Sequence, residues 1–248
     1  WKPARVLDFG CGHGRIAAAL AQDGARVVAF DPDGSLADRW QVISKDGLPI
    51  EWCTGDADEA LAGQAGTFDL VICSLVLCVI GDDQEYLATI RRLSASLSPK
   101  GRFIIVICDP DATLAGDSTM QRRLVPEGAS IEQTILWTKE LPSGTRRGDV
   151  HRPRSRVFKD LATQGLRVDQ CTSTGGLSLD SLLPSRDNLF LIGAKSSSDG
   201  IVCLTRRTSR RSVKRSPVDV PVLCYHRVLP REHDDPACRV QRRRGTVV

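Results

Sequence analysis

The stretch VLDFGCGHG at residues 6–14 decides the fold. Residues 5–9 are mostly apolar, as in a buried strand, and three alternating glycines follow at once. Glycines at such a turn let the backbone approach a ligand without a Cβ in the way. Residues 14–22 then carry apolar side chains at helical spacing, so the turn opens a helix whose free N–H groups point at that ligand. The stretch therefore predicts the strand–turn–helix unit that starts an α/β domain.

The same alternation continues along the chain. We expect further strands at 26–30, 50–54, 68–73, 102–108, 166–172 and 188–194, and helices at 35–44, 83–97 and 154–164. Such alternation is typical of a doubly wound, seven-stranded, mostly parallel α/β sheet. Residues 110–152 break the rhythm, and we expect an insertion of irregular structure after the fifth strand that could include a hairpin.

Two residues near the glycines argue against a dinucleotide site. The dinucleotide pattern G-x-G-x-x-G requires glycine at position 15, where Arg15 stands. Asp8 lies within the preceding strand, where its carboxylate would repel a pyrophosphate. A carboxylate at this place instead suits the ammonium or sulfonium group of an aminoacyl sulfonium ligand.

The pattern Asp8-x-Gly10-x-Gly12-x-Gly14 resembles the first motif of class I S-adenosylmethionine-dependent methyltransferases. The resemblance implies the family's Rossmann-like fold, S-adenosylmethionine as cofactor, and contacts to it from Asp8, Gly10, Cys11 and Gly12.

Two later positions extend the resemblance. Asp31, followed by Pro32, ends the second strand, where the family's acid binds both ribose hydroxyls. Asp56, followed by Ala57, comes after the third strand and resembles the acid that accepts a hydrogen bond from the adenine amino group.

Residues 68–80 resemble the family's fourth motif, and 97–103 its turn into the fifth strand. The loop after the fourth strand would close over the methionine part of the cofactor, with Ser74 and Leu75 in contact. The resemblance covers residue 1 to about residue 195.

Simpler interpretations exist for each of these residues. The glycines could form a plain turn, Asp31 and Asp56 could cap helices, and Leu75 and Val76 could belong to the core. Their joint placement at successive strand ends favours a shared site, because those ends meet at one crevice.

Methyl transfer is an in-line displacement that requires donor and acceptor to be held close and aligned. Residues 74–77 lack the Asn-Pro-Pro-Tyr pattern used on planar amides, so we expect a small-molecule or saccharide acceptor, methylated at oxygen rather than nitrogen. An oxygen acceptor needs a general base. His151 is one candidate, although a surface-loop histidine is the simpler interpretation; Asp109 is another, and His13 more naturally flanks the cofactor. The catalytic base stays unassigned.

Two rival functions remain open. A nicotinamide-dependent oxidoreductase would bind NADH, which Arg15 disfavours. A cofactor-binding module without activity is compatible with the start at Trp1, from which we expect the domain to be N-terminally truncated.

Bulk properties predict a cytoplasmic protein that neither spans a membrane nor binds nucleic acid. The longest nearly apolar run, 70–80, is shorter than the roughly 18 residues that a membrane span needs. The net charge of +4 reflects residues 201–248, where twelve Lys or Arg face four Asp or Glu. The nine cysteines include no C-x-x-C pair, which favours reduced thiols over disulfides or a metal site.

We therefore divide the chain into a methyltransferase domain at 1–196, a basic flexible linker at 197–217 and a tail at 218–248. The tail stretch VDVPVLCYHRVLP resembles the opening strand of polysaccharide deacetylases of the NodB-homology type. That resemblance implies the truncated start of a second enzyme domain; an unstructured basic tail is the alternative.

Overall fold

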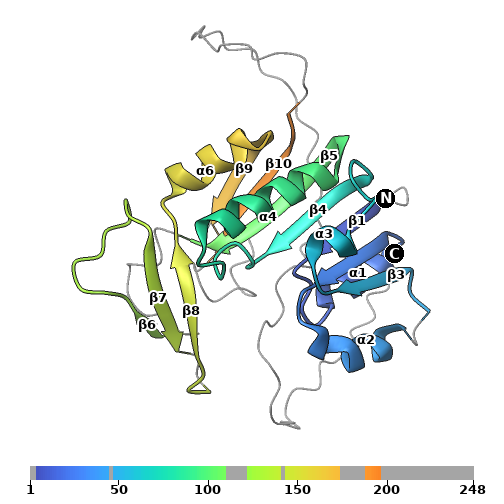
Figure 1. Ribbon diagram of the computed structural model, residues 1–248, viewed down its shortest axis with the longest axis horizontal. Helices are drawn as coiled ribbons and strands as arrows, with labels where there is room; N and C mark the ends of the chain where they lie inside the picture. Colours follow the sequence, from blue (N-terminus) through green and yellow to red (C-terminus); the bar gives the residue numbers. More distant parts are fainter. Residues whose placement is uncertain (1–3, 45–46, 110–121, 141–142, 174–187, 197–248) are drawn as a thin grey trace, which may run out of the picture. The chain divides into compact units, whose positions relative to one another are not determined.

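The computed structural model describes residues 4–44, 47–109, 122–140, 143–173 and 188–196, which build a seven-stranded sheet with its helices and a smaller sheet (Figure 1). The seven strands are β1 (Arg5–Phe9), β2 (Arg26–Asp31), β3 (Ile50–Thr54), β4 (Phe68–Ser74), β5 (Leu97–Cys108), β9 (Leu166–Ser173) and β10 (Asn188–Lys195). The linker and tail predicted from residue 197 onward lie outside the described residues.

The strand order is β3-β2-β1-β4-β5-β10-β9, and every neighbouring pair is parallel except the two pairs that involve β10. The chain runs from β1 outward to β3 and then returns to the other side of β1 at β4. Doubly wound sheets bind ligands in the crevice beyond the carboxyl ends of the strands at such a reversal. The predicted fold class is confirmed.

Side chains of β1 alternate between the two faces of the sheet. Leu7 and Phe9 join the buried cluster shared with α4 (Asp83–Ser96) and α6 (Arg154–Thr163). Asp8 points to the opposite face, where its carboxylate accepts a hydrogen bond from the backbone N–H of Ala17 in α1 (Arg15–Gln22). Helices therefore cover both faces of the sheet, as predicted.

Two boundaries differ from the prediction. β5 begins at Leu97 rather than at residue 102, and the register between β4 and β5 shifts there, so the Pro–Lys–Gly turn lies inside a strand irregularity. Gly101 fits this place because a Cβ would lie 2.8 Å from the carbonyl oxygen of Phe68. The predicted helix at 35–44 consists of a 3₁₀ turn, η1 (Gly34–Leu36), followed by α2 (Ala37–Ser44).

The insertion is more regular than expected. It contains an antiparallel sheet of β6 (Arg122–Leu124), β7 (Ile135–Glu140) and β8 (Arg146–His151). This sheet stands beside the end of the large sheet where β4 and β5 finish (Figure 1). Among the described residues, no helix is both long and apolar enough to cross a bilayer.

Candidate functional site

The glycine turn after β1 adopts the backbone conformation that its composition predicts. Gly10, Gly12 and Gly14 have φ values of +73°, +51° and +71°, which lie in the left-handed region that favours glycine. The N–H groups of Gly10 and Cys11 donate to the carbonyl of Phe30 at 2.8 and 3.0 Å, which fixes the turn against the end of β2.

Two of these glycines also lack room for a side chain. A Cβ on Gly10 would overlap Cγ2 of Val76, which follows β4, and a Cβ on Gly14 would lie 2.6 Å from the Trp40 ring. Gly12 has open space around the same position. The turn is therefore packed directly against the loop after β4, across the reversal in strand order.

Asp31 connects the end of β2 to this turn. Its Oδ2 accepts a hydrogen bond from the N–H of Gly12 at 2.8 Å, and its Oδ1 accepts one from Asp33 at 3.0 Å. Each carboxylate oxygen can accept a second bond, so both remain able to bind a ligand hydroxyl. Pro32, the next residue, is exposed.

Asp8 lies beneath the turn with only 1% of its surface exposed. Its Oδ2 has no hydrogen-bond partner among the described residues. Burial raises the pKa of Asp8 to about 7; the backbone bond from Ala17 lowers it, and the negative charge of Asp31 raises it further. A buried carboxylate with an unused oxygen is suited to a cationic ligand group at this place.

Asp56 caps a short helix, α3 (Ala57–Ala60). Oδ1 of Asp56 accepts hydrogen bonds from the N–H groups of Asp58 and Glu59 at 2.9 and 3.0 Å, so the capping interpretation is correct. Both bonds use Oδ1, which leaves Oδ2 available to a ligand. Asp56 is exposed, at the end of β3 beside Asp31 in strand order.

β4 ends at Ser74, which is half-buried, and the segment after it begins with Leu75, whose φ is +60°. Leu75 is the single described non-glycine residue with a positive φ, a conformation that costs roughly 1 to 2 kcal/mol. Its N–H donates to the carbonyl of Val106 in β5 at 2.8 Å, which holds the strained residue in place. Such strain concentrates at functional sites.

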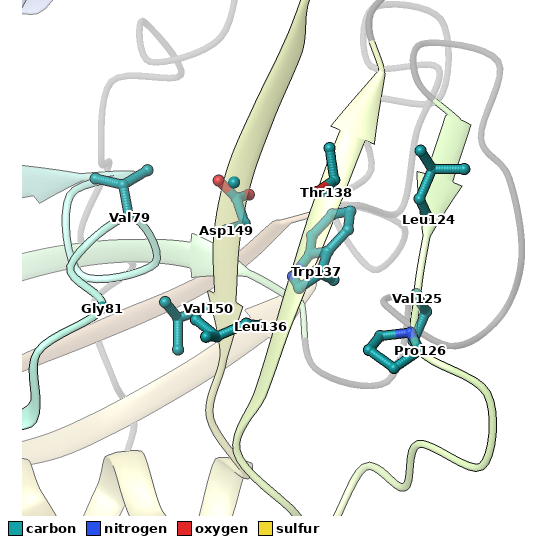
Figure 2. A pocket seen from close by; sticks show the side chains of 11 residues that line it. Val79, Gly81, Leu124, Val125, Pro126, Leu136, Trp137, Thr138, Asp149 and Val150 are labelled. Atoms are coloured by element: carbon teal, nitrogen blue, oxygen red, sulfur yellow. The ribbon is translucent and has the colours of Figure 1, made fainter.

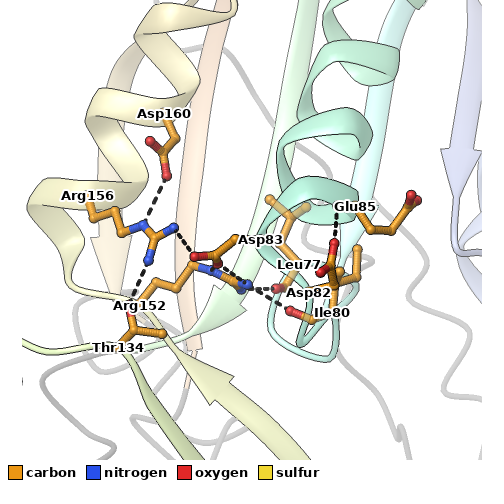
Figure 3. A network of polar contacts seen from close by, with 9 residues as sticks. All are labelled: Leu77, Ile80, Asp82, Asp83, Glu85, Thr134, Arg152, Arg156 and Asp160. Carbon is orange, nitrogen blue, oxygen red and sulfur yellow. Dashed lines mark hydrogen bonds and ion pairs between the residues drawn. The ribbon is translucent and has the colours of Figure 1, made fainter.

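Arg152, which follows β8, holds the segment after β4 through hydrogen bonds and an ion pair (Figure 3). Its guanidinium donates to the carbonyls of Leu77 and Ile80 at 3.1 and 2.8 Å and pairs with Asp83 at 3.1 Å. It also lies 3.8 Å from the centre of the Tyr86 ring, a cation–π contact. Arg152 is only 4% exposed. The sequence did not predict its role, because its partners are distant in the sequence.

A cavity of about 770 Å³ lies between the three-stranded sheet and the segment after β4 (Figure 2). Its lining is largely apolar: Val79, Leu124, Val125, Pro126, Leu136, Trp137 and Val150, with Gly81, Thr138, Gly148 and Asp149. Val79 and Leu136 are 53% and 67% exposed, so both present apolar surface where they line this cavity. The cavity is suited to a ligand with an apolar body.

A buried ion pair forms the polar part of this wall. Asp149 Oδ2 accepts hydrogen bonds from Lys139 Nζ at 2.8 Å and from Cys108 Sγ at 3.2 Å. Burial lowers the pKa of Lys139, but the charge and hydrogen bond of Asp149, together with the two nearby cysteines, outweigh the effect of burial, and the net pKa is raised. Nothing in the sequence pointed to this pair, because Lys139 and Asp149 lie on the two paired strands of a hairpin that the sequence predicted only loosely.

The three candidate bases lie elsewhere. His151 is buried at the end of β8, opposite Ile135, with Nε2 2.9 Å from the carbonyl oxygen of Ile131; the expectation of a surface-loop histidine is wrong. Asp109 is buried and pairs with Arg154 at 3.2 Å, and His13 is exposed on the glycine turn. None of the three is among the described residues that line the cavity.

Comparison with known proteins agrees with this geometry. Residues 6–101 match the family described as "Methyltransferase domain". The chain is 32% identical over 176 residues to a ubiquinone biosynthesis O-methyltransferase of Caulobacter sp. strain K31, a match that covers 67% of this chain and 68% of the relative. It is 33% identical over 143 residues to the protein of that name from Xanthomonas axonopodis pv. citri strain 306, where it spans 57% of this chain and 54% of the relative.

A solved structure shares the fold. The 1,6-didemethyltoxoflavin N1-methyltransferase of Burkholderia thailandensis, with 1,6-didemethyltoxoflavin and S-adenosylhomocysteine bound, superposes with a TM-score of 0.54 and 19% identity. The match covers 79% of this chain and 72% of that one.

Proposed function

Because the chain belongs to the class I S-adenosylmethionine-dependent methyltransferase family, we propose that it transfers the methyl group of S-adenosylmethionine to an oxygen atom of a small-molecule acceptor. The observation that carries this proposal is the buried Asp8 carboxylate, one oxygen of which has no partner among the described residues. It lies beneath the left-handed glycine turn, which a hydrogen bond to Asp31 holds in place where the strand order reverses.

The cofactor lies, on this proposal, across the carboxyl ends of β1, β2 and β3. Asp8 faces its ammonium group, and the N–H groups and open backbone of Gly10, Cys11 and Gly12 border its methionine part. Asp31 and Pro32 receive the ribose, with two carboxylate oxygens for two hydroxyls. Asp56 and Ala57 border the adenine, whose amino group donates to the free Oδ2 of Asp56.

The loop after β4 closes the cofactor site. Ser74 and the strained Leu75 lie at the carboxyl end of β4, next to the glycine turn, and Val76 contacts Gly10. This loop would shield the sulfonium from water and present its methyl group toward the cavity. Alignment at close range is the main contribution an enzyme makes to such an in-line displacement.

The acceptor binds in the cavity beside the three-stranded sheet. Its apolar lining, with Trp137 and the exposed Val79 and Leu136, favours an acceptor with an apolar body over a saccharide. The printed names of the relatives support oxygen as the methylated atom. The chain spans about half to two thirds of these relatives' length, so their acceptors are not assigned to it.

Calorimetry with S-adenosylhomocysteine and with NADH tests the cofactor. We expect saturable binding of the first, weakened at least about tenfold in Asp31→Ala, which loses a carboxylate at the ribose. Asp23→Ala, at an exposed carboxylate after α1, is the matched control and should bind normally. Binding of NADH instead would establish the oxidoreductase alternative.

Methyl transfer from labelled S-adenosylmethionine to paired acceptors tests the reaction. Apolar hydroxylated compounds should accept label, and their amino analogues and free saccharides should accept much less. Cofactor binding without transfer to any acceptor class would support the inactive-module alternative.

We also propose a cytoplasmic location, which is consistent with six described cysteines that are not in disulfides. The division into 1–196, 197–217 and 218–248 and the deacetylase-like start of the tail remain proposals. They rest on the composition of the linker and on the thirteen-residue stretch quoted above, both outside the described residues.

A further inference from the structure

Two thiols and a carboxylate from distant parts of the sequence meet behind the cavity wall. Cys78 follows β4, Cys108 ends β5 and Asp149 lies in β8. The two sulfur atoms and one oxygen of Asp149 all lie within 4.8 Å of one another. Cys78 and Asp149 are buried, and Cys108 is half-buried.

The Asp149 carboxylate has a vacant oxygen. Oδ2 accepts from Lys139 and Cys108, but Oδ1 has no hydrogen-bond partner in the part of the chain that the structure describes. Asp149 is only 1% exposed. Leaving a buried acceptor unsatisfied costs roughly 1 to 3 kcal/mol, so Oδ1 of Asp149 is suited to a further bonding partner.

We propose that Cys78, Cys108 and Asp149 bind a borderline-soft divalent cation of the Zn²⁺ class. Thiolate and carboxylate groups are the ligands that this class prefers. Tetrahedral coordination with Zn–S bonds of about 2.3 Å requires sulfur atoms a little under 4 Å apart, so the observed cluster needs to contract by about 1 Å or less. Lys139 stays on Oδ2 and orients the carboxylate from outside the coordination shell.

The charge of the cluster also suits a divalent ion. With the thiols protonated, Asp149 and Lys139 neutralise each other. When the ion binds, each thiol releases its proton to solvent, and two thiolates balance the two positive charges. The buried cluster therefore holds the same net charge with and without the ion, which avoids the large cost of an uncompensated buried charge.

The ion would join three elements that form the cavity wall. The loop after β4 and β8 already touch through one backbone bond, from the N–H of Val150 to the carbonyl of Cys78 at 2.6 Å. A shared metal would fasten the three-stranded sheet to β5 and to this loop. Because the ligands come together only in the folded chain, binding stabilises the fold.

The test uses Co²⁺ as a spectroscopic probe on the full chain, reduced and freed of metal. The three cysteines after residue 196, at 203, 224 and 238, are first replaced by serine so that every remaining thiol is a described one. We expect one site with thiolate-to-cobalt charge-transfer bands and tetrahedral d–d bands, displaced by Zn²⁺, together with a rise in Tm. The readout does not involve methyl transfer, so it is independent of the proposed function.

Matched variants locate the site. Cys78→Ser, Cys108→Ser and Asp149→Asn should each weaken Co²⁺ binding at least about 100-fold. Cys171→Ser, at an exposed thiol on β9, should leave it unchanged. If a cluster variant fails to fold, X-ray absorption of the zinc-bound parent decides instead: two sulfur and one or more oxygen or nitrogen scatterers are expected. Spectra without thiolate bands, or bands that persist in Cys78→Ser and Cys108→Ser, would overturn the proposal.

Discussion

Asp8 gives the sharpest prediction, because its protonation links stability to pH. The pKa of Asp8 is raised from its ordinary 3.8 to about 7, mainly by burial. Between these two values the unfolded chain ionises Asp8 while the folded chain keeps it protonated. The free energy of unfolding therefore falls as pH rises from about 4 to 7, and the loss is complete above about 7.

The size of this loss follows from the shift. About three pKa units at 1.36 kcal/mol each amount to about 4 kcal/mol, and full burial means that solvent screening does not reduce it. Asp8→Asn removes the titration and keeps the shape of the side chain. We expect the variant to gain about 4 kcal/mol relative to the parent chain between pH 4 and pH 7.5.

Urea unfolding of both proteins across this pH range measures the difference directly. Carboxylates far from Asp8 titrate equally in the two chains, so the difference reports Asp8 together with its interaction with Asp31. Asp23→Asn, at an exposed acid, should give a difference that does not vary with pH. A flat difference for Asp8→Asn as well would refute the raised pKa.

The same carboxylate should couple cofactor binding to proton release. On the proposed function, the ammonium group of S-adenosylhomocysteine lies beside Asp8 and favours its ionised form. Affinity should then rise up to about tenfold per pH unit below pH 7 and level off above it. Calorimetry in buffers of different ionisation enthalpy should show a released proton at pH 6. Asp8→Asn should bind more weakly, with neither effect.

Three further changes test the surrounding structure. Gly10→Ala should lower the free energy of unfolding by at least about 2 kcal/mol, because a left-handed backbone is combined with overlap of the new Cβ with the loop after β4. Gly12→Ala, which has open space, should lower it by about 1 kcal/mol; denaturant unfolding measures both. Arg152→Met should lower the free energy of unfolding by about 2 to 4 kcal/mol, because the carbonyls of Leu77 and Ile80 lose their donor. The more exposed Arg156→Met should cost about 1 kcal/mol or less, and equal losses would contradict the anchoring role. Leu136→Ser should raise the acceptor KM about tenfold and leave the affinity for S-adenosylhomocysteine unchanged.

The conformation of the glycine turn could be predicted from the sequence because its determinants are local. A glycine can be recognised as a left-handed turn residue from its neighbours, and Asp8 and Asp31 occupy fixed places at strand ends. Once the strands are ordered in parallel, those ends must meet at one edge. The structure confirms the turn formed by the three glycines. The bond from the N–H of Gly12 to Asp31 was not predicted and is a finding of the structure.

The acceptor side was poorly predicted because its contacts are distant in the sequence. Asp149 lies in a stretch rich in turn residues, yet pairing with Trp137 makes it part of a strand. The same strand pairing buries His151, although the sequence on both sides of it is typical of a loop. The sequence alone favours a surface position for the charged Arg152. Its burial is explained only by the carbonyls of the loop after β4, which surround it in the folded chain. Each of these outcomes depends on tertiary pairing that no local pattern encodes.

The loop after β4 links the two halves of the site. Val76 packs on Gly10, and Val79, whose N–H donates to the carbonyl of Val76 at 3.0 Å, lines the cavity. On the proposed function, one turn of backbone therefore sets the distance between the cofactor and the acceptor. Leu75 and Arg152 hold that turn at its two ends. Since in-line methyl transfer depends steeply on distance and alignment, loosening this turn should lower kcat far more than it weakens cofactor binding. Arg152→Lys, which keeps the charge but loses the planar guanidinium that bonds both carbonyls at once, is the variant to separate the two quantities. A parallel fall in kcat and in affinity for S-adenosylhomocysteine would show that the turn serves the cofactor alone.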